Sequence, residues 1–179
     1  LSNAAPFIPG KLQVADVKGG MFGDLRVSGL HYHNESLSLD VGALVLRWEP
    51  MGLLHRRLHV VELSVVDGRF EQLQPSEPEP ESSEPVTPPD IRLPLEIRLD
   101  RVAVNNFQVI TAPGAESLVV NQLLLRAKAE GSDIELETLE VALPDIGLET
   151  AGQVQVSGDY PLSLRNDFNL RMADVPNLR

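Results

Sequence analysis

The side chains most able to do chemistry are the four histidines, two of which, His31 and His33, are separated by one residue. That spacing would place both imidazoles on one face of a strand, which is the beginning of a metal site. No third ligand is evident, so a surface or strand-edge position is favoured. His55 and His59 flank a predicted turn without a carboxylate at a useful spacing. The sequence therefore predicts no metal site.

No catalytic signature is recognisable in the chain. Serine, histidine and aspartate occur without the pattern of a nucleophile elbow, and the glycines Gly19, Gly20 and Gly23 are not followed by the helix that a phosphate loop requires. These glycines are interpreted as turn residues. Cysteine is absent, which excludes disulfides, thiolate chemistry and cysteine-bound zinc. We expect a protein that is not an enzyme and needs no cofactor.

The charge and composition of the chain narrow its partners. The net charge is −11, with 26 acidic and 15 basic residues, and phosphate binding needs clustered Lys and Arg, so a nucleic-acid partner is not expected. No run approaches the roughly 20 apolar residues that span a bilayer. Aromatic residues make up only 4% of the chain, and the apolar residues are mostly Leu and Val, which suit half-buried strands.

Short alternations of apolar and polar residues follow one another along almost the whole chain. The clearest runs from Leu162 to Met172 and is broken on its apolar side only by Asn166. Roughly ten such segments with short connections predict an all-β protein. The alternation changes face at Ser28-Gly29 and at Gly42, where we expect β-bulges, and repeated bulges increase the curvature of a sheet.

One segment departs from the alternating pattern. Pro50 opens residues 50–57, and Arg56 and Arg57 stand at their end. Proline suits the first position of a helix, and basic side chains suit its last turn. We therefore predict one short helix near residues 50–57, in which Met51 and Leu54 form an apolar cap.

A strand pattern occurs twice, at an offset of 39 residues. The matched apolar positions are Leu63 and Val102, Val65 and Val104, and Phe70 and Val109. Each copy contains a dipeptide that can supply the positive φ of a tight turn, at residues 67–68 and 105–106. We expect each copy to be a strand, a turn and a second short strand, and the repetition to indicate an elongated sheet.

The composition also divides the chain into segments. Residues 1–6, which include Ser2-Asn3-Ala4, resemble the remainder of a cleaved expression tag. Residues 7–73 are expected to form a β segment with the short helix, and residues 92–179 to continue the same sheet. Between them, residues 74–91 hold six prolines and five acidic residues, a composition typical of disorder. We interpret this loop as a tolerated insertion and expect deletion of residues 76–88 to leave the melting temperature nearly unchanged.

Several weak motifs occur in a recognisable order. They are Phe7-Ile8-Pro9-Gly10, the stretch from Val17 to Leu25, Leu30-His31-Tyr32, the strand from Leu44 to Trp48, Gly52-Leu53-Leu54, and the strand from Val65 to Phe70. This order resembles the N-terminal periplasmic region of the TamB family, within the AsmA-like group, over most of residues 7 to about 150. In that family a Pro- and Glu-rich insertion follows the same strand before the sheet resumes. The long repetitive body and the C-terminal domain of the family are absent from this sequence.

The resemblance implies a fold, a location and a function. The fold is an elongated, strongly curved, mostly antiparallel sheet that forms a taco-like open groove with an apolar interior. The location is the periplasm, with the full-length protein anchored to the inner membrane by an N-terminal helix that this sequence lacks. The implied function is non-enzymatic and belongs to outer-membrane biogenesis: carrying phospholipid, assisting the assembly of outer-membrane proteins such as autotransporters, or both.

The resemblance also implies partners. These are phospholipid acyl chains, nascent outer-membrane β-strands, and an outer-membrane barrel assembly partner that is contacted through parts of the full-length protein not present here. An apolar trough can hold acyl chains without specific contacts, because burial gains about 0.8 kcal/mol per CH₂. The candidate groove-lining residues are Leu44, Leu46, Trp48, Val61, Leu63, Val65, Leu99, Val102, Val104, Leu123, Leu125, Leu139, Val141, Leu162, Leu164, Phe168, Leu170 and Met172.

Two alternatives stay open at this point. For any one of these apolar residues, packing in a closed core is the competing interpretation. For the whole chain, the competing hypothesis is a closed β-sandwich that serves as an interaction or adhesin module without lipid cargo.

Overall fold

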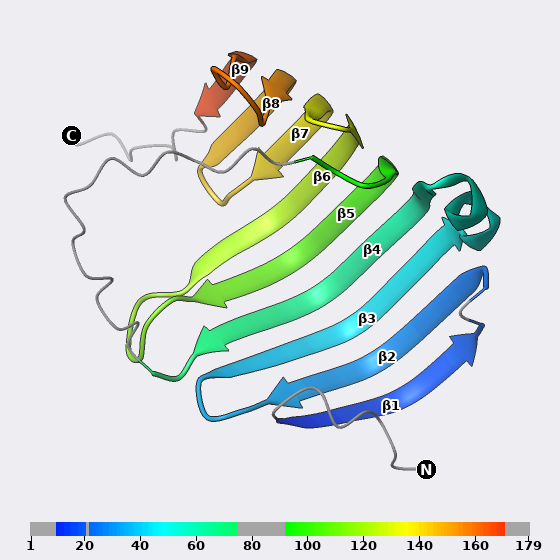
Figure 1. Cartoon of the computed structure of the whole chain (residues 1–179). Helices are drawn as coiled ribbons and strands as arrows, with labels where there is room; N and C mark the ends of the chain where they lie inside the picture. Colours follow the sequence, from blue (N-terminus) through cyan, green and yellow to red (C-terminus); the bar gives the residue numbers. More distant parts are fainter. Residues whose placement is uncertain (1–9, 21, 75–91, 171–179) are drawn as a thin grey trace, which may run out of the picture.

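The computed structural model describes residues 10–20, 22–74 and 92–170. These residues form nine strands and one short 3₁₀ helix (Figure 1). The strands are β1 (Lys11–Gly19), β2 (Asp24–His33), β3 (Leu37–Glu49), β4 (Arg57–Gln72), β5 (Glu96–Ile110), β6 (Leu118–Glu130), β7 (Asp133–Ala142), β8 (Ile146–Gln155) and β9 (Leu162–Leu170). The helix η1 (Pro50–His55) joins β3 to β4.

All nine strands belong to one sheet, in which they follow one another in chain order from β1 to β9. Every neighbouring pair is antiparallel except β4 and β5, which are parallel. The prediction of an all-β, mostly antiparallel sheet is confirmed, with nine strands in place of the expected ten. The sheet is open, since β1 and β9 each have one neighbour, so a closed sandwich is wrong for the described residues.

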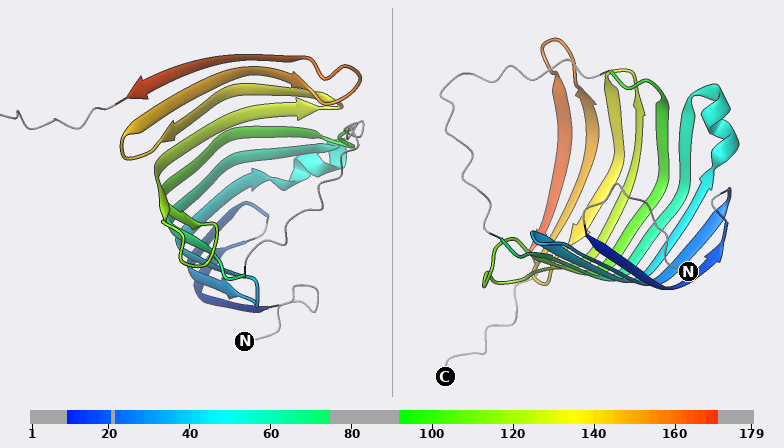
Figure 2. Two further views of the ribbon diagram at one scale, coloured as in Figure 1. Left: turned by 90° about the vertical axis from the view of Figure 1, so that its left-hand side faces the viewer. Right: turned by 60° about the horizontal axis from the view of Figure 1, so that its bottom comes forward.

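The sheet is strongly curved, as the sequence predicted. Figure 2 shows that the long strands bend along their length, so that the sheet has the shape of a trough. In both views of Figure 2, η1 and the turn between β1 and β2 lie at the same rim.

The sequence repeat is the register of the parallel pair. β4 and β5 pair at a constant offset of 39 residues, so that Leu63 faces Val102 and Val65 faces Val104. The predicted turns inside the two copies are wrong, because both strands continue through them. Asp67 and Asn106 do have positive φ, of 55° and 53°, but within uninterrupted strands.

The expected bulges at Ser28-Gly29 and Gly42 are also wrong. Gly29 has a positive φ of 59° and lies in line with Gly42, and the pairing of β2 with β3 keeps one register on both sides of them. Neither strand gains an extra residue there. The register shifts occur nearer η1, between Arg47 and Trp48, Leu99 and Val102, Arg126 and Ala127, and Leu136 and Leu139.

The parallel pairing of β4 and β5 requires a long connection between the two strands. After Gln72 the chain must return along the length of β4 before β5 begins at Glu96, whereas an antiparallel neighbour would need only a short turn. Most of this connection, residues 75–91, lies outside the described residues, so the expectations of disorder and of a tolerated insertion stay predictions.

The short helix near residues 50–57 is confirmed, as a 3₁₀ helix with Pro50 at its start. Arg56 ends it in the left-handed conformation, with a φ of 56°. The apolar cap is not: Met51 and Leu54 are 69% and 74% exposed, so the side chains do not cover the sheet.

The described residues lack a conventional hydrophobic core. Val41, Ala103 and Ile110 are the buried apolar residues among them, and none of their large side chains is fully buried. A single sheet without a second layer cannot bury its faces. Its stability depends on ladder hydrogen bonds and on contacts between side chains of neighbouring strands.

Candidate functional site: the apolar face of the sheet

One apolar residue from each of the nine strands contributes to an unbroken row across the sheet. The register aligns Val17, Val27, Leu44, Val65, Val104, Leu123, Val141, Leu148 and Phe168, in the order β1 to β9. We call this the central row. Each member stands directly beside the next, at the spacing at which cross-strand side chains touch.

Three more apolar rows run parallel to the central row on the side nearer η1. The second row is Leu25, Leu46, Leu63, Val102, Leu125, Leu139, Thr150 and Asn166. The third is Trp48, Val60, Leu99, Ala127, Leu136, Gly152 and Leu164, and the fourth is Leu58, Ile97, Ala129, Ile134, Val154 and Leu162.

The second row contains one polar interruption, between β8 and β9. Thr150 is buried, and its Oγ1 donates a hydrogen bond of 2.9 Å to Oδ1 of Asn166. The Asn166 that breaks the apolar alternation in the sequence is thus satisfied by a neighbour in the same row.

The four rows lie on one face of the sheet. In β3, β6, β8 and β9, members of the second and third rows are two residues apart, which is the repeat of one strand face. In β4, β5 and β7 they are three residues apart, and the register shifts supply the extra residue there. The bulges therefore keep the apolar side chains on the same face, and we call this surface the apolar face.

Most of the predicted lining residues lie in the four rows of the apolar face. Leu44, Val65, Val104, Leu123, Val141 and Phe168 are in the central row; Leu46, Leu63, Val102, Leu125 and Leu139 in the second; Trp48, Leu99 and Leu164 in the third; and Leu162 in the fourth. Three predicted residues differ. Val61 is the extra residue of the β4 bulge, Leu170 pairs with Ile146 near the end of β9, and Met172 lies outside the described residues.

Sequence reasoning missed several members of the rows. Val60 stands where Val61 was expected, and Leu148 completes the central row in β8. The 39-residue offset could have identified Val60, because it maps that residue onto Leu99. No comparable signal marked Leu148, which became recognisable only from the pairing of β7 with β8.

The opposite face carries ion pairs between neighbouring strands. Arg57 Nε lies 2.7 Å from Glu96 Oε2 across β4 and β5, and Lys128 of β6 pairs with Glu137 of β7. The lysine lowers the pKa of the Glu137 carboxyl by donating a hydrogen bond to it. Alternation along the strands separates these charges from the apolar rows.

His59 joins three strands on this opposite face. Its Nδ1 lies 2.9 Å from Glu49 Oε2, and its Nε2 lies 2.7 Å from Asp100 Oδ2, so the imidazole joins β3, β4 and β5. No carboxylate stands at a useful sequence spacing from His59, and both of its partners come from other strands. Hydrogen bonds to Glu49 and then to Asp100 raise the pKa of His59.

Asp100 completes this cluster. Arg98 Nε donates a hydrogen bond of 2.8 Å to its Oδ1, and this bond, followed by the one from His59, lowers the pKa of the aspartate. The cluster favours a charged imidazolium between two carboxylates. This arrangement holds three strands together. Both imidazole nitrogens are engaged with carboxylates, so the histidine does not serve as a general base.

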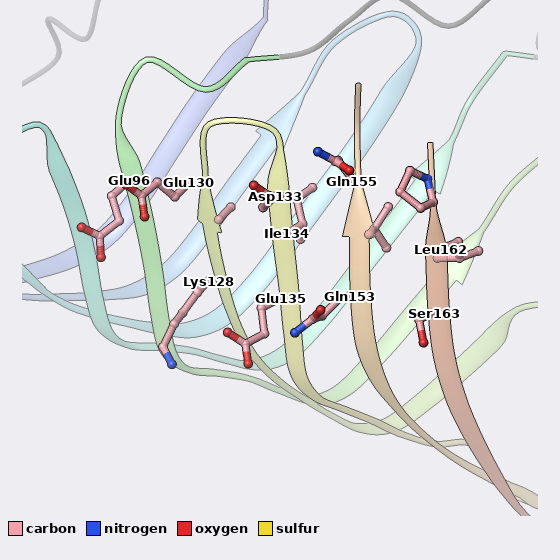
Figure 3. Close-up of a pocket in the computed structure, with 13 residues that line it drawn as sticks. Glu96, Lys128, Glu130, Asp133, Ile134, Glu135, Gln153, Gln155, Leu162 and Ser163 are labelled. Atoms are coloured by element: carbon pink, nitrogen blue, oxygen red, sulfur yellow. The ribbon is translucent and has the colours of Figure 1, made fainter. Parts of the chain in front are cut away.

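A hollow of about 470 Å³ lies at the ends of β6 to β9 (Figure 3). Lys128, Glu135 and Gln153 extend from one side of their strands there, and Ile134 and Leu162 extend from the other side. The hollow therefore lies at the edge of the sheet, where the apolar face and the opposite face meet.

Within residues 10–20, 22–74 and 92–170, no group of three or more His, Cys, Asp or Glu side chains could hold a metal ion. His31 is engaged instead with Asp40 on the neighbouring strand β3. None of the described helices has the length and hydrophobicity of a membrane span.

The sequence matches the model of a known family. The family model of the TamB N-terminal domain matches residues 1–113 and again residues 110–178. No curated protein and no solved structure matches the chain. Because the two family matches together cover nearly the whole sequence, the chain belongs to the TamB family.

Proposed function

We propose that the chain is a non-enzymatic module of an envelope protein that holds phospholipid acyl chains on its apolar face during outer-membrane biogenesis. The observation that carries this proposal is the central row, in which all nine strands place an apolar side chain in line. No second layer among the described strands covers it. A broad uncovered apolar surface is the mark of an interaction site for an apolar partner.

The dimensions of the apolar face suit a long, thin and flexible ligand. Nine strands at about 4.8 Å spacing extend roughly 40 Å along the row, which exceeds the length of one acyl chain. The row offers aliphatic contacts at every step and no pattern of polar groups that would select one position. A ligand held in this way gains about 0.8 kcal/mol per buried CH₂ and stays free to move along the row.

The curvature supports a lining role for the apolar rows. In Figure 3 the strands below the hollow bend toward the side on which Leu162 lies, away from the side of Lys128 and Glu135. This direction of bending favours the apolar rows as the inner, concave surface of the trough. The ion pairs of the opposite face then meet water on the outer surface.

Assistance to outer-membrane protein assembly is a second candidate function. The outer edges of β1 and β9 lack a neighbouring strand in the described sheet, and β1 is exposed throughout. An unpaired edge can receive an incoming strand by β-augmentation. We place the module in the periplasm, the compartment through which both lipid and nascent outer-membrane strands must pass.

The experiment compares two neighbouring residues that alternate between the faces. Leu46 belongs to the second row, and Val45 points to the other face of β3. Three proteins would be expressed in a Gram-negative host: the unsubstituted chain, the Leu46→Asp variant and the Val45→Asp variant. Each would be purified without detergent and analysed by native mass spectrometry and lipid extraction. We expect phospholipid with the unsubstituted chain and with Val45→Asp, and at least a several-fold loss with Leu46→Asp.

Circular dichroism separates loss of lipid from loss of fold. The apolar face is uncovered in the proposal, so Leu46→Asp should keep its strand signal. A lipid-free unsubstituted chain, or unfolding of Leu46→Asp with retention of structure in Val45→Asp, would contradict the proposal.

A further inference from the structure

The rim that holds η1 combines features that the lipid-carrying proposal does not use. The turn between β1 and β2 meets the end of β3 there, where the backbone N–H of Trp48 donates to the carbonyl oxygen of Gly23 at 3.4 Å. Phe22 precedes Gly23, and Met51 follows Trp48 by three residues. In Figure 2 the turn and η1 lie at the same rim of the sheet.

Large apolar side chains protrude from this rim. Phe22 is 88% exposed, Leu54 is 74% exposed and Met51 is 69% exposed. The comparably exposed apolar residues of β1 and β9 lie on the two edge strands, where a further strand could cover them. Phe22, Met51 and Leu54 lie outside all strands, so pairing with another strand would leave them in water.

Basic residues follow the protruding apolar ones directly. Residues 50–57 contain His55, Arg56 and Arg57 and no acidic residue, in a chain whose net charge is −11. Arg57 is paired with Glu96. Arg56 is exposed and caps the end of the helix, two positions after Leu54. Protruding apolar side chains next to a cationic one match the boundary between headgroups and acyl chains in a bilayer.

We propose that the rim formed by Phe22 and η1 docks onto the surface of an anionic phospholipid bilayer. Phe22, Met51 and Leu54 enter the level of the upper acyl chains, and Arg56 faces the headgroup phosphates. A protruding group of separate side chains suits a deformable bilayer, which closes around each one. Docking in this position would bring the bilayer next to Trp48, the first member of the third apolar row.

Vesicle co-sedimentation tests the proposal. The probes are vesicles of phosphatidylethanolamine and phosphatidylglycerol at 7:3 and vesicles of phosphatidylcholine alone. We expect the chain to sediment with the first vesicles and at least several-fold less with the second. The triple variant F22S/M51S/L54S should bind the anionic vesicles more weakly by a factor of about ten or more, because the strength of insertion follows the buried apolar area. Arg56→Asn, which tolerates a positive φ, should weaken binding about fivefold.

Leu118→Ser is the matched control. Leu118 is 51% exposed and begins β6 at the other end of the strands, so its substitution should leave sedimentation unchanged. Retention of the chain in the supernatant at all lipid concentrations would overturn the proposal. Equal sedimentation of the triple variant, equal binding to phosphatidylcholine, or self-association in place of vesicle binding would also overturn it.

The outcome is independent of the proposed lipid cargo. Leu46→Asp should lose copurifying lipid and still sediment with anionic vesicles, and the triple variant should show the reverse. A chain without cargo that still docks would contradict the lipid-carrying function alone. A chain with cargo that fails to dock would contradict this inference alone.

Discussion

Asn106 donates a hydrogen bond from Nδ2 to Oδ1 of Asp67 at 2.7 Å, across the one parallel pair of strands in the sheet. The two residues are 39 positions apart, which is the offset of the sequence repeat. Both have positive φ within a strand, and Gly42 of β3 lies in line with them. Positive φ therefore recurs along one line across the sheet, at Gly29 of β2, Asp67 of β4 and Asn106 of β5.

The first prediction concerns the backbone conformation of Asp67. Asp67→Asn keeps a side chain that tolerates the left-handed region and can still pair with Asn106, so we expect little change in the free energy of unfolding. Asp67→Val places a β-branched residue at a φ of 55° and should destabilise the chain by about 1–3 kcal/mol. Urea denaturation measures both values.

Arg69→Val is the control for this pair of variants. Arg69 is exposed and lies two residues further along β4, where its φ is ordinary for a strand. Valine there should change the free energy of unfolding by about 0.5 kcal/mol or less. Equal effects of valine at positions 67 and 69 would show that the left-handed residue has no special role.

The second prediction concerns Gly68 and the ring of Phe107. A Cβ on Gly68 would lie 2.0 Å from Cδ2 of Phe107, on the neighbouring strand, so the ring occupies the space that a side chain would need. Gly68→Ala should destabilise the chain by about 1–3 kcal/mol through overpacking. Phe107→Ala loses the ring's contacts but opens the space. The double variant should therefore be destabilised by less than the sum of the two single destabilisations. Strict additivity would contradict the contact.

The third prediction concerns the crossover between β4 and β5. Between Gln72 and Glu96 there are 23 residues, and the chain must return over about 50 Å, the length of 15 strand residues. Deleting residues 76–88 leaves 10 residues, which reach about 33–36 Å at most. We expect this deletion to abolish the cooperative unfolding transition, or to lower its midpoint strongly.

A shorter deletion separates the length of the crossover from its composition. Removing residues 78–81 leaves 19 residues, with a reach of about 63–68 Å, and should leave the urea midpoint nearly unchanged. Normal stability of the 13-residue deletion would show that β4 and β5 do not pair in parallel.

The fourth prediction concerns the pH dependence that His59 gives to stability. Its pKa is raised in the folded state, so its contribution is complete below the ordinary value of 6.5 and is lost as pH rises through the raised pKa. Asp100 has a lowered pKa, so its contribution is present above its ordinary value of 3.8 and is lost as pH falls through the lowered pKa. Stability from the cluster is therefore greatest between about pH 4.5 and 6.5.

His59→Gln removes the titrating charge and retains hydrogen-bonding groups. Between pH 5.5 and 8.5, the unsubstituted chain should lose about 0.5–1 kcal/mol more stability than this variant. Leu118→Ser, which changes no titratable group, is the control and should keep the pH dependence of the unsubstituted chain. The measurement is the urea midpoint at the two pH values, and parallel curves for the unsubstituted chain and His59→Gln would exclude the histidine as the cause.

Several features of this fold were predictable because they depend on local patterns. Alternation of apolar and polar residues identified the strands, and the repeat at Leu63 and Val102 contained the register of the parallel pair. The turns were misplaced because Asp67 and Asn106 have the same side-chain chemistry in a hairpin turn as in a left-handed position within a strand.

Other features depend on which strands become neighbours. His59 meets Glu49 and Asp100 only after β3, β4 and β5 have paired, and a separation of 41 positions between His59 and Asp100 leaves no local signal. The choice between Val60 and Val61 depends on a bulge that shifts the register by one residue. Such features follow from the assembled sheet.

The most direct test of the central claim is a photocrosslinker placed at Leu63 or at Ser64 in living Gram-negative cells. Leu63 is in the second apolar row, and Ser64 is the next residue of the same strand, on the opposite face. Phospholipid covalently attached at Leu63, and absent or several-fold lower at Ser64, is the predicted result. Equal labelling at the two positions, or no lipid at Leu63 while the protein remains folded, would contradict a lipid-carrying apolar face.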